Sequence, residues 1–419
     1  MAVTTDLKLA KPITLPCGLT LPNRLVKAAM TEQMADKNFL PDDAFNAVYR
    51  SWAQGGWGMV LTGNVQVDTT YLGGPADTAV NAKISEAQLL KSWKTWAEAC
   101  KSANGTPTVM QINHPGRQSP YGAGTRGFFD KNLAPSAVPL KLGDGLLQSL
   151  ASALVFGTPR EMTVAEIREV VSQFAKTARL ASEAGFAGVQ VHAAHGYLLA
   201  QFLSSASNKR TDDYGGSPVK EARIVVEVIK AIREVTPKGF AVGIKLNSVD
   251  HQSEEALADC MVQLEKIRGA GVDFLEISGG TYENPSMFLG TVEAVTMEKP
   301  TRSSTREAFF LEFSRAIRQK FRDIPLVVTG GFRNRRGMEA ALEEDACEMI
   351  GVGRPAVLNP SLPNNVIFNK EVDDADAKVF ARRIEAPWIV KKIGGRAVGA
   401  GVESSWYSKQ MRTMAETKA

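Results

Sequence analysis

Cysteine is scarce in this sequence, and its spacing excludes several kinds of protein. Only four cysteines occur in 419 residues, and none belongs to a Cys-x-x-Cys pair: Cys17, Cys100, Cys260 and Cys347. A small scaffold held by disulfides is therefore excluded, and neither an iron–sulfur cluster nor a zinc ribbon is indicated. Unpaired, scattered thiols suit a reducing compartment, so we expect a cytoplasmic protein.

An excess of one charge and a long apolar run are also missing. Lys and Arg total 49 against 45 Asp and Glu, a formal net charge of +4, and no basic run is interleaved with aromatic residues. Nucleic acid is not an expected partner. No window approaches the roughly 18 to 20 apolar residues of a membrane span, and Met1–Pro16 has no signal-peptide core, so no membrane is expected either.

Short apolar runs of strand length recur along the chain, and helical patterns separate many of them. Eight runs without in/out alternation are typical of parallel strands covered on both faces: Arg24–Ala29, Met59–Gly63, Thr108–Ile112, Gly188–His192, Val242–Leu246, Phe274–Ser278, Leu326–Thr329 and Met349–Val352. Five segments have apolar residues at three- and four-residue spacing and are predicted helices: Ser85–Ala103, Thr163–Ala184, Val219–Val235, Ser253–Arg268 and Thr305–Phe321.

Eight repeated strand and helix units predict an α/β fold, a (β/α)8 TIM barrel. An open, doubly wound sheet is the alternative, but no unit carries a GxGxxG fingerprint between strand and helix. Residues 1–366 are assigned to the barrel, with a Gly/Pro/Ser-rich rim insertion at 115–160 after the third strand. Residues 367–419 are predicted to be a docked, helical C-terminal extension.

The positions of the histidines indicate where the active site lies. In such a barrel the active site lies at the C-terminal ends of the strands. All four histidines of the sequence fall at or just after a predicted strand end: His114, His192, His195 and His251. Two imidazoles and a phenol, Tyr197, lie within six residues of each other. They are candidates for oxyanion stabilisation, metal binding and proton donation.

The last two strands end in glycines that predict a phosphate site. Thr329-Gly-Gly331 and Gly351-Val-Gly-Arg354 would expose backbone N–H groups, and Arg354 could pair with a dianion. Three further side chains, Gln111, Lys245 and Thr31, reach the same rim. Each also has a purely structural interpretation: Gln111 as a turn donor, Lys245 as the ion-pair partner of Asp250, and Thr31 as a helix N-cap.

These residues together resemble the Old Yellow Enzyme family of FMN-dependent ene-reductases. The resemblance runs from about Leu21 to about Pro360, and the HAAHGYL and RTDDYGGS blocks are its most specific parts. It is carried by Pro22–Thr31, Gln111–Arg117, His192–Leu203, Ser207–Ser217, Gly330–Gly331 and Gly353–Arg354.

The resemblance implies two half-reactions: NAD(P)H reduces FMN, which then passes hydride to the β-carbon of an α,β-unsaturated carbonyl compound. His192 and His195 would bind the carbonyl, Tyr197 would protonate the α-carbon, and Tyr282 would line the substrate pocket. Thr31 would lie near the flavin O4, Gln111 at the pyrimidine edge and Lys245 at N1/O2. The implied FMN-binding residues are Ala29, Met30, Thr31, Gly63, Gln111, Lys245, Gly330, Gly331, Gly353 and Arg354.

Two departures and two alternatives accompany this interpretation. Many relatives have Pro at the position of Ala29 and Arg at that of Lys245, and a lysine lacks the bidentate guanidinium fork. One alternative is a metal-dependent barrel hydrolase with His114, His192, His195 and Asp250 as ligands. The other is a flavin-binding redox protein without turnover. By analogy with the family we expect a homo-oligomer, a dimer, and no metal.

Overall fold

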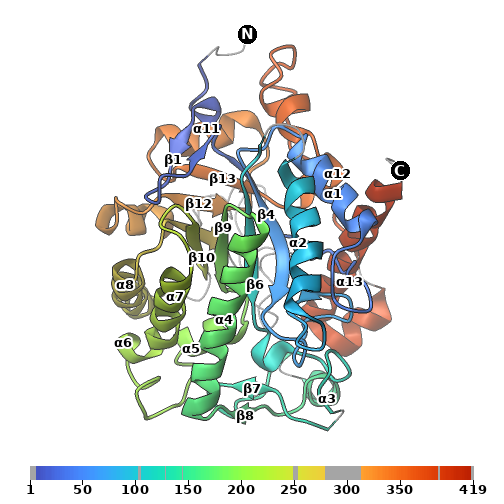
Figure 1. The fold of residues 1–419 in the computed structure, drawn as a ribbon, viewed down its shortest axis with the longest axis vertical. Helices are drawn as coiled ribbons and strands as arrows, with labels where there is room; N and C mark the ends of the chain where they lie inside the picture. Colours follow the sequence, from blue (N-terminus) through green and yellow to red (C-terminus); the bar gives the residue numbers. More distant parts are fainter. Residues whose placement is uncertain are drawn as a thin grey trace.

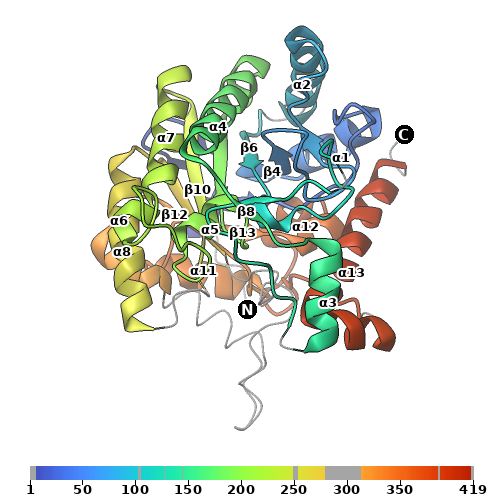
Figure 2. The ribbon, with the colours of Figure 1, turned by 90° about the horizontal axis from the view of Figure 1, so that it is seen from below.

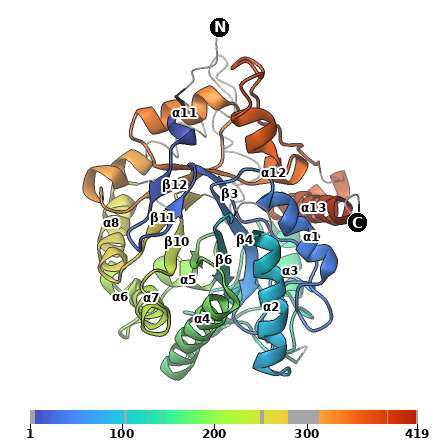
Figure 3. The ribbon, with the colours of Figure 1, turned by 45° about the horizontal axis from the view of Figure 1, so that its top comes forward.

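The eight predicted strands form a closed parallel barrel. We describe a computed structural model of the chain over residues 6–101, 105–127, 129–143, 145–248, 253–278, 313–385 and 387–416, without the side chains of 388–400. The barrel strands are β3 (Leu25–Lys27), β4 (Met59–Gln66), β6 (Thr108–Asn113), β9 (Gly188–Ala193), β10 (Ala241–Asn247), β11 (Phe274–Ser278), β12 (Leu326–Thr329) and β13 (Met349–Val352). Each strand pairs with the next, and β13 pairs with β3, which closes the ring (Figure 1; Figure 3). The predicted TIM barrel is confirmed, and the doubly wound alternative is wrong.

Helices cover the outside of the barrel (Figure 3). They are α1 (Asp43–Ala53), α2 (Glu86–Lys101), α4 (Val164–Ala184), α6 (Pro218–Glu221), α7 (Arg223–Val235), α8 (Glu254–Gly269), residues 313–320, α11 (Arg335–Glu343) and α12 (Arg354–Leu358). Thr163 and Glu166 form a capping box at the start of α4, and Gly185, at φ +98°, ends it. The predicted start of the helix at Thr305 lies outside the described residues.

The barrel interior changes from apolar to polar along its axis. At the end where the strands begin, a buried apolar cluster fills it: Leu15, Leu21, Val26, Met59, Leu61, Val109, Ala241, Phe274, Val327 and Met349. Leu15 and Leu21 come from the hairpin of β1 (Ile13–Thr14) and β2 (Thr20–Leu21), which therefore closes this end. Further along the strands, toward their C-terminal ends, buried polar side chains follow, among them Gln111, Gln190 and Lys245.

The rim insertion folds into short elements around the other end of the barrel. The described part of the insertion contains η2 (Gly116–Gln118), β7 (Leu133–Ala134), α3 (Leu146–Val155) and β8 (Arg160–Glu161). Short segments described elsewhere are η1 (Lys8–Ala10), β5 (Thr78–Ala79), α5 (Leu198–Leu203) and η3 (Pro363–Ile367). Within the insertion β7 and β8 pair in parallel, and α3 lies against the C-terminal helix (Figure 2).

The C-terminal extension ends in a long helix that packs on the barrel. This helix, α13 (Trp388–Glu416), contacts α1, α12 and α3. Tyr407 on α13 is fully buried and its Oη donates a hydrogen bond to the carbonyl of Arg382 at 2.7 Å. Within the described residues no helix is both long and apolar enough to cross a membrane.

Candidate active site

A cavity of about 1050 Å³ opens at the C-terminal ends of the barrel strands. Its walls include most of the residues that the sequence predicts for the site: Ala29, Met30, Thr31, Gln111, His192, His195, Tyr197, Lys245, Gly330, Gly331, Gly353 and Arg354. Gly63 lies one layer further out, where its N–H donates to Glu32 Oε1 at 2.8 Å. Tyr282, His251 and Asp250 lie outside the described residues.

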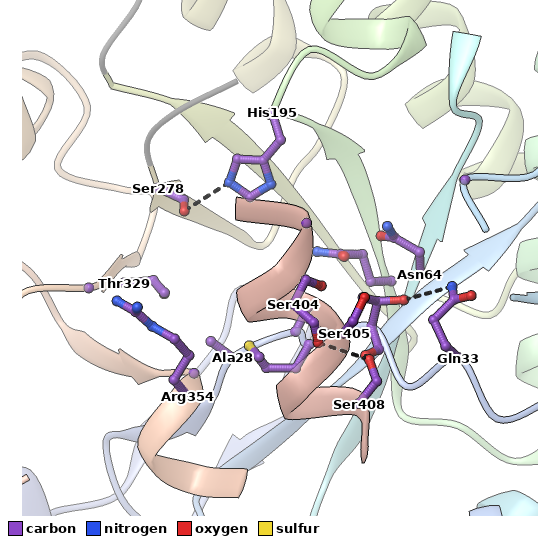
Figure 4. Close-up of a pocket in the computed structure, with 18 of the residues that line it drawn as sticks. Ala28, Gln33, Asn64, His195, Ser278, Thr329, Arg354, Ser404, Ser405 and Ser408 are labelled. Carbon is purple, nitrogen blue, oxygen red and sulfur yellow. Dashed lines mark hydrogen bonds between the residues drawn. The ribbon is translucent and has the colours of Figure 1, made fainter. Parts of the chain in front are cut away.

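The two imidazoles and the phenol lie ring against ring. The His192 ring centroid lies 5.0 Å from that of His195 and 4.8 Å from that of Tyr197, both edge to face. His195 has a left-handed backbone, φ +59°, which turns the chain sharply after β9. Its N–H donates to Asn247 Oδ1 at 2.9 Å, and its Nε2 lies 3.1 Å from Ser278 Oγ (Figure 4).

His192 is held in one tautomer. Its Nδ1 accepts a hydrogen bond from the N–H of Ala194 at 3.2 Å. Burial, followed by the nearby charges of His195 and Lys245, lowers the pKa of His192 well below 6.5. The ring is therefore neutral near pH 7, and because Nδ1 is the acceptor, the proton lies on Nε2.

Tyr197 is the nearest phenol to this pair and is almost buried, with 8% of its surface exposed. Asn64 of β4 donates from Nδ2 to the Tyr197 Oη at 3.4 Å. Gln118 of η2 donates from Nε2 to the carbonyl of His195 at 3.0 Å. The rim insertion and β4 thus hold the loop that carries the three rings.

Beneath the cavity floor, four polar side chains form a continuous buried chain. Gln111 Nε2 donates to Gln190 Oε1, and Gln190 Nε2 donates to Glu276 Oε2, each at 2.7 Å. Lys245 Nζ lies 3.0 Å from the other carboxylate oxygen, Glu276 Oε1. The described ion-pair partner of Lys245 is therefore Glu276, a residue that the sequence analysis did not single out.

The purely structural interpretations of Gln111 and Thr31 are wrong. Gln111 lies inside β6, where it is not a turn donor. Thr31 caps no helix, because α1 begins at Asp43. Instead, the Thr31 carbonyl accepts a hydrogen bond from Ser408 Oγ of α13 at 3.0 Å.

The glycine-rich ends of β12 and β13 form one corner of the cavity. Gly330 and Gly331 have φ values of +110° and +91°, which only glycine adopts without strain. Thr329 Oγ1 is buried and has no hydrogen-bond partner among the described residues. Arg354 pairs with Glu403 of α13, whose side chain is 1% exposed. Figure 4 shows Thr329 and Arg354 on one side of the cavity and Asn64 on the other.

The C-terminal helix supplies a whole wall that the sequence analysis missed. Six residues of α13 line the cavity: Gly401, Ser404, Ser405, Ser408, Lys409 and Arg412. They recur every three to four positions, so they lie on one helix face. That spacing of small and basic residues was the sequence signal from which this wall could have been predicted.

The rim insertion adds an apolar border to the cavity, formed by Leu142, Val155 and Phe156.

The third described histidine at the rim, His114, is not among the residues that line the cavity. Its Nδ1 accepts from the N–H of Gly116 at 3.0 Å, and its ring lies 5.4 Å from that of Tyr71. Burial lowers the pKa of His114 to about 4. Within the described residues no three His, Cys, Asp or Glu side chains cluster as metal ligands do, so the described part offers no support for the hydrolase alternative.

Comparison with known proteins defines the class of this chain. A profile of the NADH:flavin oxidoreductase / NADH oxidase family matches residues 8–372. The chain belongs to this family and is an FMN-dependent flavin oxidoreductase of the Old Yellow Enzyme type, with NAD(P)H as its reductant. The match stops before α13.

Several relatives share half of the sequence. The chain is 54% identical to NADH-dependent flavin oxidoreductase iccE of Talaromyces variabilis, over 98% of this chain and 99% of that protein. It is also 54% identical to NADH-dependent flavin oxidoreductase iliE of Neonectria sp. (strain DH2), over 97% of this chain but only 54% of that protein. The chain thus spans about half the length of that second relative.

Solved structures show the same fold. A 2-naphthoyl-CoA reductase in complex with 2-naphthoyl-CoA has a TM-score of 0.73 and 25% identity, over 95% of this chain and 58% of that one. Morphinone reductase has a TM-score of 0.68 and 24% identity, over 90% of this chain and 95% of that one. Because its identity is only 24%, the similarity to morphinone reductase shows a shared fold and nothing more.

Proposed function

We propose that this protein is an NAD(P)H-dependent ene-reductase that reduces the C=C bond of an α,β-unsaturated carbonyl compound. The observation that carries the proposal is the convergence of three side chains on one cavity: His192, whose ring is neutral, His195 and Tyr197. Two hydrogen-bond donors and one proton donor are what a carbonyl group and its α-carbon require. The two relatives that share 54% of the sequence are named NADH-dependent flavin oxidoreductases, which supports NADH as the reductant.

The cavity residues fit FMN at both of its ends. At the glycine corner, the backbone N–H groups of Gly330, Gly331 and Gly353 and the Arg354 guanidinium would hold the phosphate. The buried Thr329 hydroxyl without a partner among the described residues lies at the same corner. A Cβ at Gly351 would lie 1.9 Å from that hydroxyl, so this wall is kept open by the absence of a side chain.

The other end offers donors for a heteroaromatic ring. Gln111 and Lys245 would bind the pyrimidine edge, and Thr31, Met30 and Ala29 the opposite side. Gly63 would act indirectly, because a Cβ there would lie 2.5 Å from the Met30 carbonyl. When bound, FMN supplies the hydride chemistry: it accepts a hydride from NAD(P)H and passes it to the substrate.

The imidazoles would polarise the substrate. His192 is neutral with its proton on Nε2, so it can donate to a carbonyl oxygen that becomes more negative during the reaction. His195, held at its backbone by Asn247, would be the second contact to that oxygen. The resulting withdrawal of electron density makes the β-carbon a better hydride acceptor.

Tyr197 would supply the proton. Its Oη lies against Asn64 Nδ2, a donor, so the phenol's own proton is directed elsewhere. A tyrosine pKa near 10 is a reasonable match for an α-carbon that has enolate character.

Anaerobic stopped-flow measurement of the two half-reactions tests this function. The purified protein should have a flavin spectrum, NADH should bleach it, and cyclohexenone should restore it. Tyr197→Phe should slow reoxidation by the enone about 10²- to 10⁴-fold and leave reduction by NADH within about twofold, because general acid catalysis has that magnitude. Tyr214→Phe, outside the cavity, is the matched control.

Three outcomes would contradict the proposal. A protein that binds no flavin would refute the site, and equal losses in both half-reactions would refute the role of Tyr197. If NADH bleached the flavin and no enone restored it, the protein would match the alternative of a flavin-binding protein without turnover on such substrates.

A further inference from the structure

The buried chain under the cavity floor ends in a carboxylate that no solvent reaches. Gln111 is 2% exposed, Lys245 3%, and Gln190 and Glu276 both 0%. Each link is short, 2.7, 2.7 and 3.0 Å from Gln111 to Lys245. Gln111 and Lys245 line the cavity, whereas Gln190 and Glu276 lie behind them.

The carboxylate fixes the orientation of both amides. An ionised Glu276 only accepts hydrogen bonds, so Gln190 must turn its Nε2 toward it. Gln190 then presents its oxygen to Gln111, and Gln111 must donate from Nε2. The orientation of the Gln111 amide in the cavity is therefore set by Glu276, which acts through Gln190 and does not itself line the cavity.

The same carboxylate offsets the positive charge at the floor. Glu276 Oε1 lies within ion-pair distance of Lys245 Nζ, but within the described residues no hydrogen bond is aligned on this oxygen. The contact is thus one of charge with charge. In a buried environment a unit charge at this distance acts strongly on its surroundings.

We propose that Glu276 is a positioning residue that lowers the electron affinity of the bound flavin and orients Gln111 through Gln190. The proposal rests on the proposed function, in which Lys245 and Gln111 contact FMN. Negative charge gathers at the N1/O2 edge on reduction, and Lys245 alone would favour that state. Glu276 opposes it, so the pair makes the reduced cofactor a stronger hydride donor than a lone lysine would.

Neutralising the carboxylate should have two effects. In Glu276→Gln the amide oxygen would face Lys245, because an NH₂ group against an ammonium is unfavourable. The NH₂ group would then face Gln190, and both Gln190 and Gln111 would have to turn over. The flavin would meet a more positive floor and an inverted Gln111 amide.

The first experiment measures the FMN midpoint potential of the holoenzyme by anaerobic equilibration with a reference dye. Glu276→Gln should shift the two-electron equilibrium at least tenfold toward the reduced form, which is about 30 mV. Glu276→Asp keeps the charge and should stay within threefold of wild type. Glu221→Gln is the matched control, since Glu221 is also a buried carboxylate bonded to a glutamine, Gln263, but belongs to α6, remote from the cavity wall.

The second experiment separates the charge effect of Glu276 from its orienting effect on Gln111 through Gln190, which we call the relay. Gln190→Met breaks both amide links and leaves Lys245 and Glu276 paired. FMN titration by fluorescence quenching should show an increase of about tenfold in its dissociation constant, with a midpoint potential closer to wild type than that of Glu276→Gln. This variant also keeps the relay testable if Glu276→Gln fails to fold.

If Glu276→Gln binds FMN and its potential is unchanged or lower, the charge role is overturned. If Gln190→Met binds FMN as tightly as wild type, the relay is overturned. Both results differ from failure of the proposed function, in which wild type itself would bind no FMN or would not be reoxidised by an enone.

Discussion

At the scale of single residues, the two described buried histidines differ in what their rings face. His192 and His114 both accept a backbone N–H at Nδ1 and both have lowered pKa values. Only His192 faces the cavity, so its Nε2 proton is available to a ligand. His114 faces Tyr71, and its neutrality serves the fold.

The first prediction concerns His114 and pH. The pKa of His114 is about 4 in the folded chain, against about 6.5 in an unfolded one, so below pH 6.5 the unfolded state binds more protons. The neutral His114 ring therefore costs no unfolding free energy above pH 6.5, and the unfolding free energy decreases as the pH falls from 6.5 toward 4. At pH 5 the loss is about 2 kcal/mol, on the order of 1.36 kcal/mol for each pH unit below 6.5.

Urea denaturation at pH 7 and pH 5 checks this prediction. Wild type should lose about 2 kcal/mol more of its unfolding free energy between the two pH values than His114→Gln does. Gln can still accept the N–H of Gly116. Identical pH dependence in both proteins would show that His114 is not the neutral, buried group described.

Some residues of the candidate site could be predicted from the sequence and others could not. Position within or after a strand, together with the family resemblance, was enough to predict twelve residues that line the cavity. It could not select Glu276 or Gln190, because both lie in apolar-looking strands and their partners are on other strands. Nor could it assign the tautomer of His192, which depends on an N–H two residues away in a turn.

At the scale of elements, α13 joins parts of the site that are far apart in sequence. Ser408 binds the Thr31 carbonyl, Glu403 binds Arg354, and Arg412 binds the Gln33 carbonyl. The helix lies outside the matched residues 8–372. Sequence analysis predicted a docked helix here but no role in the cavity, since its polar face has no motif of its own.

The second prediction tests how α13 is held. Tyr407→Ala removes a fully buried ring and its hydrogen bond to Arg382, and large aromatic truncations cost about 3 to 5 kcal/mol. The helix should undock locally, and trypsin should then cleave after Lys409 and Arg412 at least tenfold faster than in wild type. Gln410→Ala should be cleaved at the wild-type rate.

Mass spectrometry of timed digests identifies the sites. Cleavage of Tyr407→Ala elsewhere, with α13 intact, would mean that this residue does not secure the helix. FMN should slow the cleavage in wild type, because Thr31 and Arg354 link the proposed cofactor site to the helix.

The third prediction concerns packing inside the barrel. A Cβ at Gly243 would lie 2.1 Å from Phe274 Cζ, and that ring is fully buried in the apolar cluster. Gly243→Ala should therefore lower the unfolding free energy by about 1 to 3 kcal/mol, the usual cost of overpacking. Gly239→Ala is the matched control, because a Cβ there meets nothing within 4 Å.

Thermal denaturation by circular dichroism measures both variants. Equal melting temperatures for Gly243→Ala and Gly239→Ala would show that Phe274 can move aside at little cost, which would contradict this prediction. The register of β10 against β11 that creates this contact was not readable from the sequence, which predicted both strands but not which residue faces which.

At the scale of the whole molecule, one surface is unusually apolar. Five residues of α3 are exposed, by 41% to 87%: Leu146, Leu147, Leu150, Leu154 and Val155. Contiguous apolar patches of this kind mark interaction sites. The predicted homo-oligomer is untested by the structure, and α3 is the described surface that suits it best.

The fourth prediction follows from that surface. Sedimentation velocity should show a concentration-dependent dimer for wild type and a monomer for Leu150→Glu combined with Leu154→Glu, because two charges would oppose burial of the helix face. A monomeric wild type, or a dimer unaffected by the two charges, would remove α3 as the contact.

The placement of α13 also bears on how the protein is made. Residues 401–412 form a cavity wall, and they are synthesised after every barrel strand. A nascent chain can close its barrel while these residues are still inside the ribosome. Such a chain would have a ring of strands with an incomplete pocket, so cofactor capture should wait until residues 401–412 have left the ribosome.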